Sequence, residues 1–227
     1  GYITKDGIVR NLTIEGASNV EGSTDDGVGV LAAQNYGLII DCNILSSTLE
    51  FTNNSVDVKK TGFICAHNLG NIINCHVKDC TLSIDQYFQA GFITGVLKGK
   101  VLNCLSFNNY FSMRNTKSAY IGGIAGFSSS EKSSSIVNCY IYTIAKNNRK
   151  YFGSVIGFAQ KGLVRNAFYN TGNAYYREPT STEFINTDIV TKEEGFIYND
   201  TLITDHFHNW IDTKGKANYP DIVFKRW

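Results

Sequence analysis

The stretch GNIINC at residues 70–75 decides the fold, because variants of this hexapeptide recur along the chain. The other copies are GIVRNL (7–12), GLIIDC (37–42), GKVLNC (99–104), SSIVNC (134–139) and GLVRNA (162–167). We name the sixth residue of each copy the anchor, which is Leu12, Cys42, Cys75, Cys104, Cys139 or Ala167. Successive anchors are 30, 33, 29, 35 and 28 residues apart. A period near 30 residues with variable loops is typical of stacked-repeat proteins.

A second motif precedes the hexapeptide at a nearly constant distance. Its copies are GVLAA (29–33), GFICA (62–66), GFITG (91–95), GGIAG (122–126) and GSVIG (153–157). The third residue is aliphatic in every copy, and the fifth is Ala or Gly. Five matched copies indicate that each repeat forms the same local structure.

The residue before each anchor marks a corner in the chain. The third residue before the anchor is apolar in every copy, and so is the anchor itself. Side chains alternate faces along a strand, so these two positions cannot share one face of a straight strand. A turn between them removes the conflict, because Asn and Asp tolerate the left-handed conformation and bond to nearby backbone. The corner residues are Asn11, Asp41, Asn74, Asn103, Asn138 and Asn166.

Each repeat is therefore predicted to be a strand, a corner and a second strand, with a third side in the variable stretch. Stacked in register, the repeats predict an all-β fold, a right-handed parallel β-helix (β-solenoid) of about five to six coils. Like residues would lie about 4.8 Å apart, so the corners form an amide ladder and the anchors a buried ladder. The second residue before the anchor is apolar in four copies but Arg10 and Arg165 in the outer two. The pattern leaves open whether this position or the one before it points inward.

Residues 171–227 break the repeat and are predicted to form a C-terminal cap on a repeat domain that spans residues 1–170. Apolar residues recur at helical spacing over 200–213, from Leu202 to Trp210 and Ile211. Asn199 and Asp200 fit the N-cap of that helix, and the string from Thr191 to Glu194 fits a capping box. Trp210 and Trp227 are the expected packing anchors, because the open end of a solenoid has to be covered.

The cysteines are expected to be core residues. Cys42, Cys75, Cys104 and Cys139 share the anchor position with Leu12 and Ala167, so an apolar filler suits the position. In-register side chains point in parallel, which is poor geometry for a disulfide. Zinc needs convergent ligand spacing, and on the predicted helix His206 and His208 would lie about 200° apart. We therefore expect reduced, buried thiols and no metal or cofactor.

A candidate binding face comes from the residue after each anchor, which should point outward. These residues are Thr13, Asn43, His76, Leu105, Tyr140 and Phe168, and they become more apolar and aromatic towards the C-terminus. Two alternatives follow. His76, Leu105, Tyr140 and Phe168 could bind a sugar or the edge of another protein, or the C-terminal segment could pack over them. The second alternative is favoured.

Composition and charge exclude several classes of function. The 21 Lys and Arg nearly balance the 20 Asp and Glu, so the chain has no basic footprint for nucleic acid. No apolar run approaches the roughly 18–20 residues that span a bilayer, so no membrane insertion is expected. A carbohydrate-active enzyme would need two or three carboxylates on neighbouring rungs. The strings Asp25–Asp26 and Asn186–Asp188 fit turns better.

The combination of GGIAG (122–126), GFITG (91–95) and GNIINC (70–75) resembles the GLUG-type repeat, roughly Gly-Gly-Leu-Val-Gly followed by Gly-x-Ile-x-Asn-Cys. The resemblance covers about residues 29–227. Its tail, HNWIDTKGKANYPDIVF (208–224), resembles the Asn-Trp and Tyr-Pro ending that follows such repeats in gut-bacterial surface proteins. The chain departs from the pattern at Ala66, Ser134 and Ala167, which are structural positions.

The resemblance implies a piece of a large secreted or surface-anchored bacterial protein. Proteins with such repeats include adhesin-like proteins and the non-catalytic regions of IgA-specific metallopeptidases. We therefore expect a non-enzymatic surface module, extracellular or on the cell surface, with any signal or anchor outside this chain. Its partners would be a host glycan or glycoprotein and the neighbouring domains of the longer chain. The alternatives are a β-helix polysaccharide lyase or glycoside hydrolase, or the non-catalytic domain of an IgA-protease-like metallopeptidase. The family supplies no catalytic residues to carry over.

Overall fold

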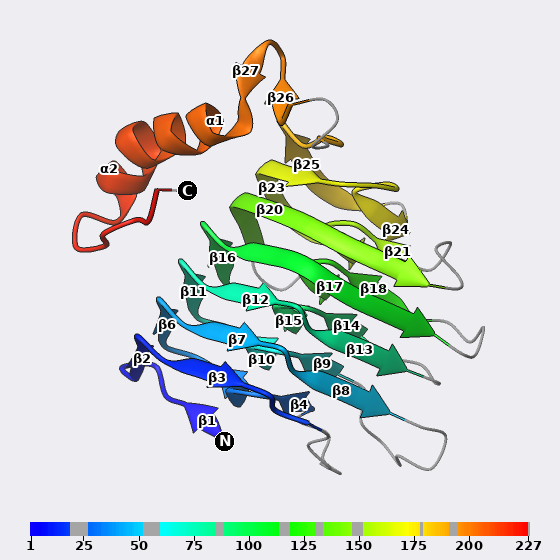
Figure 1. The fold of residues 1–227 in the computed structure, drawn as a ribbon. Helices are drawn as coiled ribbons and strands as arrows, with labels where there is room; N and C mark the ends of the chain where they lie inside the picture. The colour runs from blue at the N-terminus through cyan, green and yellow to red at the C-terminus, as the bar shows by residue number, and fades with distance from the viewer. Residues whose placement is uncertain are drawn as a thin grey trace.

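A computed structural model of the chain describes residues 1–18, 27–51, 60–84, 89–113, 119–129, 134–146, 152–177, 179–190 and 195–226. Parallel strands stack as rungs into a β-solenoid, and a helical C-terminal segment lies beside it (Figure 1). This arrangement confirms the predicted parallel β-solenoid. Asp25, Asp26, Thr191, Glu194 and Trp227 lie outside the described residues.

Three parallel sheets, A, B and C, form the walls of the solenoid. Sheet A contains β1 (Tyr2–Ile3), β5 (Ala32–Asn35), β10 (Cys65–Asn68), β15 (Thr94–Leu97), β19 (Ala125–Ser128), β22 (Ile156–Ala159) and β24 (Tyr175–Arg177). Sheet C contains β4 (Val28–Gly29), β9 (Lys60–Gly62), β14 (Gln89–Gly91), β18 (Tyr120–Gly122) and β21 (Phe152–Gly153).

Sheet B contains the strands on both sides of the predicted corner. These are β2 (Ile8–Arg10), β3 (Thr13–Glu15), β6 (Leu38–Ile40), β7 (Asn43–Leu45), β8 (Thr48–Phe51), β11 (Asn71–Ile73), β12 (His76–Lys78), β13 (Thr81–Ile84), β16 (Lys100–Leu102), β17 (Leu105–Met113), β20 (Ser134–Lys146), β23 (Lys161–Tyr169) and β25 (Ser181–Ile185). Equivalent residues of the repeat are register partners, because Ile72 pairs with both Ile39 and Val101. Each sequence repeat is therefore one rung.

The corner residues form the backbone turn and the side-chain ladder that the pattern predicts. Their φ angles lie between 48° and 60°, the left-handed region, from Asn11 through to Asn166. Each asparagine from the third rung on donates an amide N–H to the side-chain oxygen one rung earlier, at 2.8–3.3 Å. Asn186 adds a further step, with φ 48° and a 3.2 Å bond to Asn166. We name these side chains the corner ladder.

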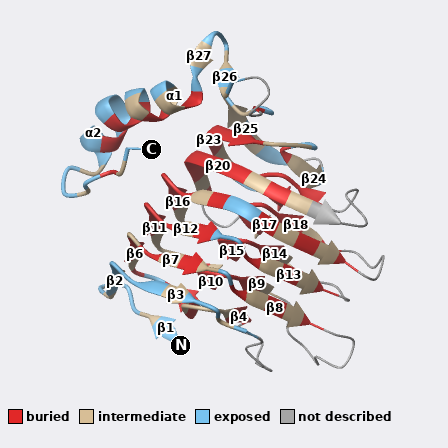
Figure 2. Ribbon diagram, viewed as in Figure 1, coloured by how far each residue is buried: buried red, intermediate tan, exposed pale blue. Residues whose placement is uncertain are grey.

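The structure resolves which of the two apolar positions before the corner points inward. The third residue before the anchor, such as Ile72, lies in the main core cluster inside the solenoid. The second points outward, and Ile40, Ile73, Leu102 and Val137 form a separate cluster with Trp210, Ile211 and Phe224. Arg10 is exposed and Arg165 half-buried. The outward position is therefore apolar only on the rungs that this cluster covers, while the first rung is mostly exposed (Figure 2).

Parallel pairing continues beyond residue 170. Tyr175 of β24 pairs with Ile156, and Phe184 of β25 pairs with Val164. The remaining C-terminal segment, residues 195–226, contains the strands β26 (Ile197–Tyr198) and β27 (Thr201–Leu202), the helix α1 (Ile203–Trp210), a π-helical turn (Ile211–Gly215) and the short helix α2 (Lys216–Asn218). From here on, "C-terminal segment" means residues 195–226.

The predicted N-cap of the helix was wrong. Asn199 and Asp200 have φ angles of 47° and 59° and join β26 to the antiparallel β27. Two consecutive left-handed residues suit a tight hairpin turn, which competes with capping for the same residue types. The helix begins later, at Ile203, after Leu202, whose side chain makes no capping bond. Leu202 is 47% exposed, so Ile203 and not Leu202 is the apolar contact.

Candidate functional site

The C-terminal segment covers the aromatic end of the predicted binding face. Phe168 is fully buried, and its ring centroid lies 5.1 Å from that of Tyr198 and 5.7 Å from that of Phe207. Tyr140 is 7% exposed in the same cluster, together with Val190. The covering alternative therefore applies to Tyr140 and Phe168, which present no ring face to solvent.

His76 and Leu105, the other two residues of that face, are register partners and half-buried. Burial lowers the pKa of His76 to about 4, and the nearby Lys225 ammonium acts in the same direction, while Asp41 opposes both. Lys225 and Asp41 form an ion pair of 3.2 Å beside the ring. The neutral imidazole therefore belongs to the junction between the solenoid and the C-terminal segment.

The depressed pKa of His76 predicts a pH dependence of stability. Between pH 6.5 and about 4 the unfolded chain binds more protons at this histidine than the folded chain. The contribution of His76 to the free energy of unfolding is thus complete above pH 6.5, decreases as the pH falls and levels off below about 4. Denaturant unfolding of the wild type and of His76→Gln should show that the free energy of unfolding decreases less on acidification in the variant. Equal losses in both proteins would contradict the assignment.

The corner ladder holds the C-terminal segment through its remaining amide hydrogens. Asn74 donates to the carbonyl oxygen of Val223 at 2.8 Å, and Asn103 donates to that of Lys225 at 2.9 Å. Asn138 donates to the carbonyl oxygen of Phe207 at 3.0 Å. These donors therefore bind the chain's own backbone.

The anchor cysteines lie in the solenoid core. All six cysteines are buried and unpaired, and each anchor thiol approaches the carbonyl oxygen two residues before it at 3.2–3.4 Å. Burial raises the pKa of Cys65 and Cys139 to about 12 and that of Cys80 to about 11. Within the described ranges, no group of three or more His, Cys, Asp or Glu is placed to hold a metal ion.

Because the thiols are buried and their pKa values are raised, we expect them to react slowly with thiol reagents in the folded state. A thiol reagent at pH 8 should titrate about six thiols after denaturation and almost none before it, because only the thiolate reacts. Above pH 9, unfolded thiols ionise while folded ones stay protonated, so the free energy of unfolding should fall as the pH rises. Disulfides between adjacent rungs would contradict this arrangement.

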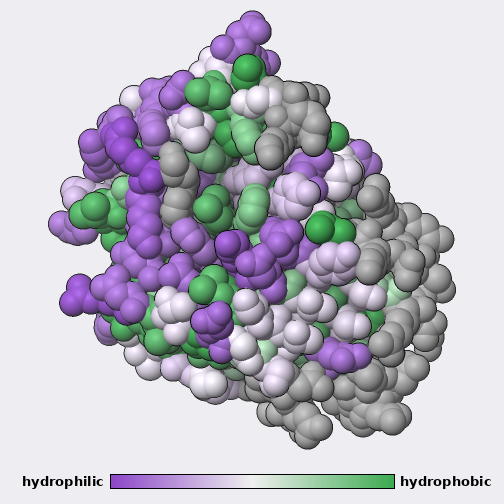
Figure 3. Space-filling view, viewed as in Figure 1, coloured by the Kyte–Doolittle hydropathy of each residue, from purple (hydrophilic) through white to green (hydrophobic). Residues whose placement is uncertain are grey.

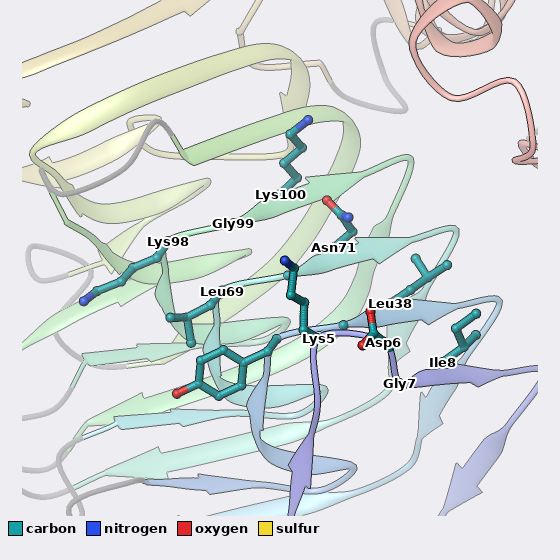
Figure 4. A pocket seen from close by; sticks show the side chains of 13 residues that line it. Lys5, Asp6, Gly7, Ile8, Leu38, Leu69, Asn71, Lys98, Gly99 and Lys100 are labelled. Carbon is teal, nitrogen blue, oxygen red and sulfur yellow. The ribbon is translucent and has the colours of Figure 1, made fainter.

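An open groove crosses four rungs at the corner between sheets A and B (Figure 4). Its volume is about 520 Å³, within the range of small-ligand sites. The floor follows Gly37, Gly70 and Gly99. A Cβ on each of these would lie 2.0–2.1 Å from the carbonyl oxygen of the glycine one rung earlier. The rungs approach too closely there for any side chain, so the floor stays bare.

Charged and aromatic side chains line the groove. The charged residues of the lining are three lysines and one aspartate: Lys5, Lys98, Lys100 and Asp6. Tyr36 is 44% exposed, and its hydroxyl donates to the side-chain oxygen of Gln34 at 2.7 Å, which fixes the ring. We name this site the glycine-corner groove.

The sequence pattern did not identify the glycine-corner groove. Its polar residues flank the first glycine of each hexapeptide, as Lys98 and Lys100 flank Gly99. The available signal was a charged or aromatic residue directly beside that glycine in several copies.

Two other surfaces also carry aromatic side chains. On the outer side of sheet A, the rings of Phe127 and Phe158 pack with Tyr120, and Arg177 lies 4.8 Å from the Phe158 ring centroid. Their faces are already occupied by one another. A second hollow, of about 720 Å³, lies at the last rungs and includes Tyr175 and Phe184. In Figure 3, hydrophobic side chains on the visible face form separate patches among hydrophilic ones.

Two carboxylates at the corners of sheet B lie beside amides. Asp41 accepts a hydrogen bond from Asn74, and Asp79 accepts one from Asn108, both on the next rung. Each is therefore tied into a structural ladder. None of the helices in the described part of the chain has the length and apolar character needed to cross a membrane.

Comparisons of the chain with protein-family models, with curated proteins and with solved structures find no match.

Proposed function

We propose that this chain is a non-enzymatic binding or spacer module on the surface of a larger bacterial protein, with an adhesin-like role. The observation that best supports the binding role is the glycine-corner groove. It crosses four rungs, about 14 Å at 4.8 Å a rung, and several of its side chains are exposed, among them Lys5 and Tyr36.

The solenoid suits the role of a rigid carrier. One apolar cluster runs from the second rung to the last, and its members include Val28 and Ala174. Each rung adds a fixed step along the stack, so the fold sets the distance between whatever lies at its two ends. The resemblance of GGIAG (122–126) and GNIINC (70–75) to GLUG-type repeats supports an extracellular or cell-surface setting.

A host glycan or glycoprotein is the proposed partner. Sugars are bound by an aromatic ring together with hydrogen-bonding side chains, and the groove offers Tyr36 with Asn71, Asp6 and the lysines. In an IgA-protease-like metallopeptidase, the same module would be a non-catalytic binding or spacer domain attached to the protease domain.

A glycan array on the purified chain tests the proposal, with Tyr36→Ala as the matched variant. We expect binding that is lost in the variant, and no release of sugar products when bound polysaccharides are incubated with the chain. Tyr110→Ala, on sheet B, is the control and should bind like the wild type. Product release would replace the proposal with the lyase or hydrolase alternative. No binding to any glycan would leave only the spacer role.

A further inference from the structure

We propose that the glycine-corner groove takes an anionic sugar, one that carries a carboxylate or a sulfate group. This inference rests on the proposed function and names the class of its ligand. The charge of the lining is the first reason: three lysines against one aspartate leave a net positive site on a chain whose overall net charge is only +1. A groove lined by one sign of charge concentrates ligands of the opposite sign.

The lysines stand at the two ends of the groove, with the Lys98 side chain extending away from those of Lys5 and Lys100 (Figure 4). Lys98 and Lys100 flank the floor residue Gly99 on the fourth rung, and Lys5 stands on the first (Figure 4). Lys5 is exposed and forms no ion pair with any residue in the part of the chain that the structure describes. Its ammonium therefore remains available to an anionic group.

Lys100 is held at the rim by the C-terminal segment. Its Nζ donates to the hydroxyl oxygen of Tyr219 at 2.6 Å and lies 4.9 Å from the centre of the same ring. Both interactions are with neutral groups, so the positive charge of Lys100 is positioned but not neutralised. A ligand in the groove would meet a fixed charge at this end.

Backbone hydrogen bonding favours a sugar over an acidic peptide. The floor amides are already used, because Gly70 N donates to Asn35 O and Gly99 N donates to Asn68 O, each at 3.0 Å. Asn71 N and Lys100 N likewise donate to the carbonyl oxygens of Gly37 and Gly70, each at 2.9 Å. An extended peptide could not add as a further strand there. A sugar ring needs only the side chains, with Tyr36 for its apolar face.

The test is a titration of the full chain with tetragalacturonate, its fully methyl-esterified form, a sulfated chondroitin tetrasaccharide and a hexaglutamate peptide. The ester keeps the shape of the acid and removes its charge. We expect the acid or the sulfated sugar to bind at least about tenfold more tightly than the ester, and the affinity to fall with added salt. The two acidic sugars separate a carboxylate-selective site from a sulfate-selective one.

Charge-removing variants locate the site. Lys5→Gln and Lys98→Gln remove the charge but keep a polar side chain, and each should weaken binding of the acidic sugar about two- to fivefold. Lys78→Gln on β12, far along sheet B, is the matched control and should leave the affinity unchanged. The melting temperature of each variant should equal that of the wild type.

Several results would overturn the inference. Equal affinity for the acid and the ester would show that the charge of the ligand does not contribute to binding in this groove. Unchanged affinity in Lys5→Gln and Lys98→Gln would show the same. Preferential binding of hexaglutamate would make the ligand a peptide. If neutral glycans bind and the lysine variants have no effect, the proposed function stands and only the anionic ligand is wrong. If no glycan of any kind binds, the anionic ligand and the proposed binding role both fail, and only the spacer role remains.

Discussion

Replacing Asn103 with alanine is expected to lower the free energy of unfolding by about 3 kcal/mol. Alanine would have to keep a φ of 52°, which costs about 1 kcal/mol. The change also removes the bonds from Asn103 to Asn74 and to the carbonyl oxygen of Lys225, and it leaves one of the two amide hydrogens of Asn138 without its partner. Buried groups without partners cost about 1–3 kcal/mol. Urea unfolding followed by circular dichroism measures the loss.

Two matched variants separate these causes. Asn103→Gly tolerates the left-handed backbone and loses only the side-chain bonds, so its loss should be about 1 kcal/mol smaller. Asn11→Ala makes the same change at the exposed first rung, where the free energy of unfolding should fall by about 1 kcal/mol. If Asn103→Ala and Asn11→Ala were equally mild, the buried corner ladder would not stabilise the solenoid.

Replacing Phe168 with alanine is expected to cost about 3–5 kcal/mol, the usual loss for a fully buried phenylalanine. The ring packs against Tyr198, His206 and Phe207, so the variant should also release α1 from sheet B. Hydrogen exchange should show faster amide exchange over residues 203–210, with the solenoid strands still protected.

Phe107→Ala is the control for Phe168→Ala. Phe107 lies on β17 of the same sheet and is 39% exposed, so about 1 kcal/mol or less is expected. If the Phe168→Ala variant kept full stability and lost glycan binding, the Phe168 side chain would not be buried. Phe168 would then be an exposed ligand residue, and the C-terminal segment would not cover it.

The repeat pattern predicted the solenoid because it reports contacts between equivalent residues of adjacent rungs. Ile72 meets Ile39 and Val101 for the same reason that all three occupy one position in the hexapeptide. The left-handed corner could be predicted as well, since few residue types other than Asn and Asp tolerate it. Local chemistry and stacking register are both visible in a repeating sequence.

Contacts between the solenoid and the non-repeating segment were not predictable in the same way. The outward direction of Phe168 followed from strand alternation, but its burial depends on where Phe207 folds back, some forty residues later in the chain. The same holds for the apolar side chain of Ile73, which belongs to one buried cluster with Trp210. The prediction of an N-cap at Asn199 and Asp200 failed for a local reason, because a hairpin turn and a helix cap use the same residue types.

The repeat pattern also did not predict a second corner. Ser46, Asp79 and Asn108 stand four residues after their anchors with φ angles of 47–56°. Three different residue types at one position conceal the shared backbone conformation. The glycine-corner groove was hidden in a similar way, because it combines unlike residues from four rungs around an invariant glycine floor.

Chemical-shift mapping with the acidic tetrasaccharide tests most directly whether the binding surface is the glycine-corner groove. Backbone amide signals of Tyr36, Leu69 and Lys98 should shift as the sugar is added, with a common dissociation constant. Signals of Tyr140 and Phe168, beneath the C-terminal segment, should stay in place. Shifts centred on Tyr140 and Phe168 instead would contradict both the covering of that face and the site proposed in the groove.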